Sequence, residues 1–242
     1  MEAITRRMPS WALSLGLGLV MSPLLSSTPI LQYIGWFLAS LFHESGHCIA
    51  ALLTGHSALP AIRLDGHAAA VHGPQSRIMV FVTWAGLFYA TFILRRRIVL
   101  AIPIGVLALV YPLLAFTMVG EVVHLSCGHL GELAFASYAM YCAATGGFTH
   151  GASERVAYAL LGFWLFGRNL KLFIGLVTDA GARALYSENG SFGMENDLLR
   201  IAGHCSVSLP AVAFVFVLIT IVVAAVSLAL AIRSARLNLT VA

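Results

Sequence analysis

The sequence predicts an all-α fold, a polytopic bundle of six or seven membrane-spanning helices with a metal site on one of them. Three observations support this. Of the 242 residues, 60% are hydrophobic and 10% are charged, whereas about 25% are charged in an average soluble domain. The apolar residues form runs of about the 20 residues that a helix needs to cross a bilayer. One of these runs contains HESGH, at residues 43–47.

Six apolar runs are expected to cross the membrane as helices: 29–53, 77–94, 98–119, 130–144, 156–177 and 209–232. An earlier run, 11–25, is shorter and ends at Pro23 and two serines. We expect it to cross as well, with partial entry or an interfacial position as alternatives. Arg6 and Arg7 before it imitate a signal peptide, but no convincing cleavage site follows, so we expect it to be retained. No repeat or soluble domain is evident, and the prediction is a single membrane domain over residues 1–242.

The topology follows from the basic residues, which stay on the cytoplasmic side of membrane spans. Arg95, Arg96 and Arg97 place the loop between the second and third of these six runs inside. Counting onward places 120–128 in an outer loop and 180–208 outside. Arg6 and Arg7 disagree with this rule if the first run crosses. The protein is therefore expected in a bacterial inner membrane or an equivalent one, with its metal site towards the non-cytoplasmic half.

The polar residues gather on that same outer side. Eight of the nine histidines fall there: His43, His47, His56, His67, His72, His124, His129 and His204. The net charge of +4 comes without a basic run interleaved with aromatic residues, so nucleic acid is not an expected partner. The four cysteines have no paired short spacing, which indicates neither a zinc ribbon nor a disulfide framework.

HESGH has the spacing of a metal-binding helix. His43 and His47 are four residues apart and so share one helical face, where two imidazoles can bind one zinc ion. Glu44 is next to the first ligand and is placed to act as a general base. A chance occurrence is the alternative, but ionisable side chains within a membrane are costly and by default mark function.

HESGHCIAALLTG resembles the metal-binding helix of the site-2 protease family of intramembrane zinc metalloproteases, and the following ALPAIRLDGHAAAVHGP resembles the extended segment after that helix. The resemblance covers residues 37–74. It implies a zinc peptidase whose third metal ligand is an aspartate in an LDG motif on a later membrane helix. Here Leu64, Asp65 and Gly66 have those letters, but they directly follow the helix that contains HESGH, so their position does not match.

Other residues are better placed to be the third ligand. His129 and Glu132 are three apart, share a helical face and lie where an outer span end is expected, as do Glu121 and His124 nearby. The alternative for Glu132 is a helix start, where the helix dipole favours a carboxylate.

Asp197, in SFGMENDLLRIAG, is a further metal ligand in this prediction. Its neighbour Asn196 has two interpretations: it hydrogen-bonds a substrate or an oxyanion, or it caps the helix that begins at Asp197.

The sequence thus predicts a membrane-embedded zinc metallopeptidase that hydrolyses membrane-associated polypeptides. His43 and His47 bind zinc, Glu44 activates water, and a residue among His129, Glu132 and Asp197 completes the site. Membrane lipid and a membrane-anchored polypeptide substrate are the expected partners. Two alternatives stay open: a di-iron-like membrane oxidoreductase that uses the additional His and Glu pairs, and a protease-derived, non-catalytic subunit of a larger membrane complex.

Overall fold

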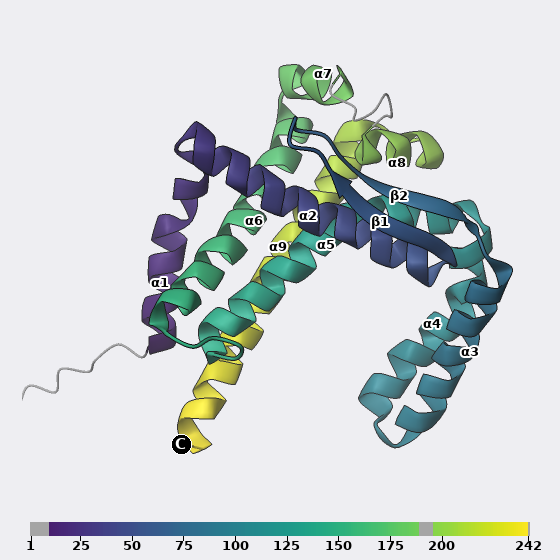
Figure 1. The fold of residues 1–242 in the computed structure, drawn as a ribbon, viewed down its shortest axis with the longest axis horizontal. Helices are drawn as coiled ribbons and strands as arrows, with labels where there is room; N and C mark the ends of the chain where they lie inside the picture. Colours follow the sequence, from purple (N-terminus) through teal and green to yellow (C-terminus); the bar gives the residue numbers. More distant parts are fainter. Residues whose placement is uncertain (1–9, 189–195, 242) are drawn as a thin grey trace, which may run out of the picture. The chain divides into compact units, whose positions relative to one another are not determined.

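The computed structural model describes residues 10–188 and 196–241 (Figure 1). Arg6 and Arg7, and the part of SFGMENDLLRIAG before Asn196, lie outside these residues. The prediction of an all-α fold is confirmed, with one small hairpin added. The elements in order are α1 (Ser10–Met21), the 3₁₀ turn η1 (Ser22–Ser26), α2 (Pro29–Leu53), β1 (His56–Ile62), β2 (Ala68–Gln75), α3 (Arg77–Ile93), the 3₁₀ turn η2 (Leu94–Arg96), α4 (Ile98–Phe116), α5 (Met118–Thr145), α6 (Ala152–Thr178), α7 (Ala180–Glu188), α8 (Asp197–Cys205) and α9 (Leu209–Val241).

Within the described residues, four helical segments are long and apolar enough to cross a membrane. They are Arg77–Arg96, Ile98–Phe116, Ala152–Thr178 and Leu209–Leu237. A fifth qualifies only if Ser10–Ser26 and Pro29–Leu53, which meet at an angle of 107°, are taken together as one broken or re-entrant segment. These lengths and compositions are those of a membrane protein. The six or seven spans predicted from the sequence stay a prediction.

The chain forms two compact units. The first contains the described residues up to Ala39, Glu132–Arg183 and those from Pro210 onward, and the second contains Ser40–Gly131 and Ala184–Leu209. In the first unit, α1 lies beside α6 (Figure 1). Arg155 of α6 donates hydrogen bonds to the carbonyls of Ala143 and Ala144, at 2.9 and 2.7 Å. These bonds satisfy carbonyls that the C-terminal turn of α5 leaves without a helical partner.

In the second unit, α3 and α4 form a helical pair (Figure 1). Pro112 lies inside α4 and has no N–H for the carbonyl four residues earlier, which belongs to Ala108. Trp84 of α3 replaces that donor, because its indole Nε1 lies 2.7 Å from the Ala108 oxygen. In an apolar surrounding every backbone carbonyl needs such a partner, so the proline is tolerated where a tryptophan faces it.

The backbone carbonyls at the C-terminal end of α2 also accept hydrogen bonds from side chains of the second unit. The hydroxyl of Tyr111 donates to the Leu53 carbonyl at 2.6 Å, and the Gln75 amide donates to the Thr54 carbonyl at 2.9 Å. The same amide reaches the Ala115 carbonyl at 2.7 Å. These bonds fix the helix that carries HESGH to α4 and to the end of the hairpin.

The sequence prediction of a loop at 120–128 is wrong, while the placement of this stretch on the outer side stays a prediction. This stretch is the first part of α5, which begins at Met118. Its polar residues lower the local hydropathy and so imitate a loop, but they have partners within the second unit that allow the helix to continue. Glu132 consequently lies in the middle of α5, and the alternative that placed it at a helix start is wrong too.

Candidate metal centre

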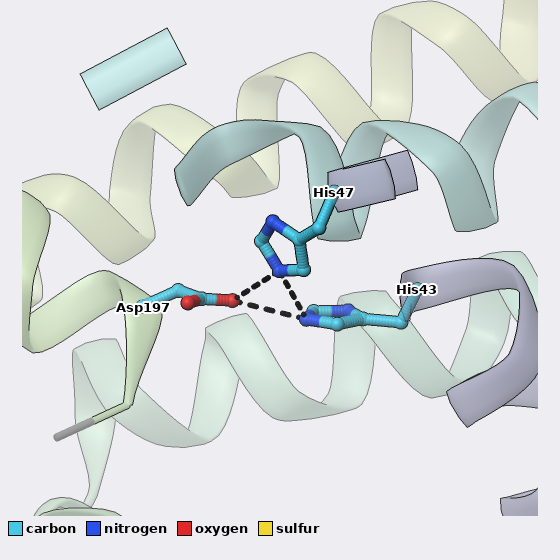
Figure 2. A group of neighbouring side chains, drawn as sticks. All are labelled: His43, His47 and Asp197. Carbon is cyan, nitrogen blue, oxygen red and sulfur yellow. Dashed lines mark hydrogen bonds and ion pairs between the residues drawn. The ribbon is translucent and has the colours of Figure 1, made fainter. Parts of the chain in front are cut away.

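His43, His47 and Asp197 converge within the second unit. The helical spacing of α2 places the two imidazoles one turn apart, with their Nε2 atoms 3.2 Å from each other. Asp197, the first residue of α8, brings its Oδ2 atom to 3.0 Å from each of these nitrogens (Figure 2). Three potential ligand atoms from two elements that are distant in sequence therefore meet at one point.

The spacing of these atoms fits a tetrahedral metal. Zinc binds nitrogen and carboxylate oxygen at about 2.0 to 2.2 Å, and tetrahedral angles at such lengths separate the ligand atoms by roughly 3.3 Å. The observed separations of 3.0, 3.0 and 3.2 Å are close to this value. The side chains of His43 and Asp197 are 18% and 20% exposed, so this group of ligand atoms is not fully enclosed.

The protonation of His47 also favours a cation. Its Nδ1 lies 2.9 Å from the carbonyl oxygen of His124, and because a carbonyl only accepts, Nδ1 carries the hydrogen. In the neutral ring Nε2 then has a lone pair, and this lone pair faces the Asp197 oxygen. Two acceptors at 3.0 Å are stable only with a proton or a metal ion between them. A metal-binding histidine commonly has its second ring nitrogen bonded in this way.

Asp197 is held as an anion. Its burial raises the pKa of the carboxyl group, but the polar contacts with His43 and His47 outweigh this and hold the pKa well below its usual range. Tyr186 of α7 lies nearby and stays a neutral phenol, because burial and the charge of Asp197 raise its pKa. Asn196 occupies the N-cap position of α8 but makes no side-chain cap bond. Its amide instead donates to the Tyr186 carbonyl.

Glu44 is buried beside these ligands, with 7% of its surface exposed. It interacts electrostatically with both imidazoles and with Asp197, and its carboxylate accepts a hydrogen bond from the backbone N–H of Ala70 in β2. Ala70 is opposite Pro60 in the hairpin. Opposite residues of an antiparallel pair either exchange hydrogen bonds or both point their N–H groups away from each other. Proline has no N–H to exchange, so this pair suits the second kind of position, in which the Ala70 N–H points away from β1. The hairpin thus orients the carboxylate predicted to act as the base.

Two glycines allow α2 and α5 to approach closely enough for this arrangement. A Cβ on Gly46 would collide with the carbonyl oxygen of Cys127. A Cβ on Gly128 would collide with Nε2 of His43 and lie 2.5 Å from Nε2 of His47. Small residues permit such close helix contacts in membranes. Here they also leave the space beside the two imidazole nitrogens open.

The other predicted ligands have different surroundings. His129 of α5 is buried, and its ring lies edge-on to that of His43 with centroids 4.7 Å apart. Glu132 belongs to the first unit, where it is fully buried and binds Arg168 at 2.6 Å and Asn169 at 2.9 Å. A role of either as a metal ligand stays a prediction.

More imidazoles continue from His47 toward the hairpin. The ring of His124 lies 5.2 Å from that of His47, His72 follows at 5.3 Å, and His56 at a further 6.0 Å. Burial lowers the pKa of His72, and the neighbouring His56 lowers it further. The neutral form of His72, in which an imidazole can bind metal, is therefore favoured.

Asp65 of the LDG sequence lies in the hairpin turn rather than on a helix. Its carboxylate pairs with Arg63 at 2.6 Å and with His67 at 3.1 Å. These contacts stabilise the turn, in agreement with the sequence position that argued against Asp65 as the third ligand.

Comparison of the chain with known protein families, curated proteins and solved structures finds no match.

Sequence reasoning missed several contributors to this centre. The carbonyl of His124 and the N–H of Ala70 belong to the backbone and leave no signal in the sequence. Gly128 could have been found, because a small residue near a polar cluster on an apolar helix indicates close helix packing.

Proposed function

We propose that this chain is a membrane-embedded zinc metallopeptidase of the site-2 protease type. The observation that carries the proposal is the convergence of the His43 and His47 nitrogens with the Asp197 carboxylate, where one metal ion would satisfy all three groups. Two imidazoles and one carboxylate with an open position are the ligand set of many hydrolytic zinc sites. HESGH and its place on an apolar helix support the same conclusion.

His43, His47 and Asp197 would hold the ion. Zinc supplies a Lewis acid that polarises a carbonyl and lowers the pKa of water to about 7. Glu44 takes the proton of the attacking water and returns it to the leaving amine, and the N–H of Ala70 keeps its carboxylate oriented. Burial of Glu44 excludes competing solvent from this proton transfer.

The substrate class follows from the apolar character of the chain. A membrane-anchored polypeptide would have to unwind locally before cleavage, since a hydrogen-bonded helix occupies its carbonyls. Membrane lipid is the second partner. The arginine cluster at 95–97 supports a cytoplasmic position for that loop and a metal site in the non-cytoplasmic half of a bacterial inner membrane or an equivalent one.

The contacts of two glutamates favour this function over a di-iron oxidoreductase. Such a site needs several carboxylate ligands. Glu121 is paired with Arg200 at 2.9 Å, and Glu132 is paired with Arg168 at 2.6 Å. Each carboxylate therefore already has an arginine as its partner, which a di-iron site would have to displace or share.

The test is to measure metal content and hydrolysis for the detergent-purified wild type and for Glu44→Gln. We expect about one zinc per chain in both proteins, with cleavage of a membrane-anchored model polypeptide lost only in the variant. Glu154→Gln is the control, because Glu154 is an exposed carboxylate bonded to the His150 N–H in the first unit. Iron in place of zinc would favour the oxidoreductase. Bound zinc without cleavage of any polypeptide by the wild type would favour a non-catalytic subunit.

A further inference from the structure

One face of α8 makes polar contacts with two other helices, α2 and α5. Asp197, Arg200 and His204 follow one another at spacings of three and four residues, so they share a helical face. Asp197 reaches the imidazoles of α2. Arg200 and His204 both reach one oxygen, Oε1 of Glu121 on α5, at 2.9 and 3.1 Å.

The place of α8 is critical because it supplies the third ligand atom. A metal site tolerates errors of only about 0.2 Å in its bond lengths, while a helix of nine residues is marginal by itself. Leu198, Ile201 and Ala202 are buried and attach α8 to the unit. Apolar burial is non-directional, however, so it does not by itself fix the position of α8 along its axis.

Glu121 supplies directional polar contacts that fix the position of α8 along its axis. It lies in the first turn of α5, where the helix dipole favours a carboxylate, and it accepts from two donors one turn apart on α8. One turn further along α5, the His124 carbonyl holds His47 of α2. The first two turns of α5 are thus bonded to both ligand-bearing helices.

We propose that Glu121 is a positioning residue for the metal centre: through Arg200 and His204 it holds α8 so that Asp197 stays against His43 and His47. The proposal rests on the metal centre of the proposed function and adds to it a residue that does not touch the metal. The side chains of Glu121 and Arg200 are 43% and 37% exposed, and ion pairs so exposed contribute little to global stability. Removing this pair should therefore change metal binding while the fold persists.

The experiment uses the full chain in detergent with zinc and cobalt as probes. Zinc affinity is measured by competition with a chelator, the cobalt absorption spectrum reports the ligand set, and thermal unfolding reports the fold. Glu121→Arg and Arg200→Glu are each expected to weaken zinc binding about tenfold to a hundredfold, as loss of a supporting contact does. Both should shift the cobalt spectrum toward that of Asp197→Ala. The double variant Glu121→Arg/Arg200→Glu restores the opposite charges and should recover affinity and spectrum.

Glu154→Arg is the matched control, since Glu154 is also an acidic residue in the first turn of a helix, and it should bind zinc like the wild type. Wild-type affinity and spectrum in Glu121→Arg, with Asp197→Ala impaired, would overturn the positioning role alone. So would a double variant no better than the single ones. Unchanged metal binding in Asp197→Ala would refute the metal centre itself and the positioning role with it.

Discussion

Replacing Gly128 by alanine tests whether the two imidazoles bind metal in the observed geometry. The added Cβ would collide with Nε2 of His43 and lie 2.5 Å from Nε2 of His47. Ordinary contacts of a Cβ begin at 3.4 Å, so the His47 ring would have to retreat by about 0.9 Å, the difference between these distances.

A displacement of this size is several times the roughly 0.2 Å that a metal–ligand bond tolerates. At least one imidazole would therefore leave the ion. We expect zinc affinity to fall about a hundredfold or more, which corresponds to about 2.7 kcal/mol of binding free energy. Chelator competition on the purified protein measures this change directly.

Loss of the fold is not expected to explain this result, because alanine is the better helix former by about 1 kcal/mol. Gly203→Ala is the control. Gly203 also lies in a helix of the second unit, but a Cβ there meets nothing within 4 Å. Wild-type zinc affinity in Gly128→Ala would refute the assignment of the metal to these two nitrogens.

Two further predictions concern stability. Trp84→Phe leaves the carbonyl opposite Pro112 without a donor, and we expect a loss of about 1 to 3 kcal/mol in the free energy of unfolding. The loss should shrink in a Pro112→Ala background, which regains its own N–H; equal losses in both backgrounds would contradict this account. Arg168→Met removes the positive charge beside the buried carboxylate of Glu132, at a cost of about 3 kcal/mol. Arg95 is exposed and lies over the Phe92 ring, so Arg95→Met should cost about 1 kcal/mol or less. Equal effects of the two substitutions in denaturant titrations would refute the pairing of Arg168 with Glu132.

The helical class and the starts of four long helices could be predicted because hydropathy is a local property of the sequence. The predicted runs starting at residues 29, 77, 98 and 209 begin where α2, α3, α4 and α9 begin. The early part of α5 was missed because Glu121, His124 and His129 resemble a loop when their partners are unknown. Those partners lie in α2 and α8, distant in sequence.

The residues proposed to bind the metal differ in the same way: some positions follow from local sequence and others depend on contacts distant in sequence. His43 and His47 could be predicted because the geometry of a single helix fixes their spacing. Asp197 was one of three candidates for the third ligand, beside His129 and Glu132, because its distance from the two imidazoles depends on how α8 packs. Glu121 was considered as a ligand and is instead paired with Arg200, a contact between residues 79 positions apart.

The carboxylates of the chain give a final argument for a cation at this centre. An apolar protein can keep acidic groups only where each has a compensating donor. Several meet this requirement through N–H groups: Glu44 with Ala70, Glu121 with Arg200, Glu132 with Arg168 and Asn169, Glu154 with His150, and Asp179 with Gly181. Asp197 differs in one of its two imidazole contacts, because the Nε2 atom of His47 that it meets at 3.0 Å carries a lone pair when the ring is neutral. A protonated ring would be a second charge to bury, whereas one divalent ion would satisfy the carboxylate and both imidazoles together.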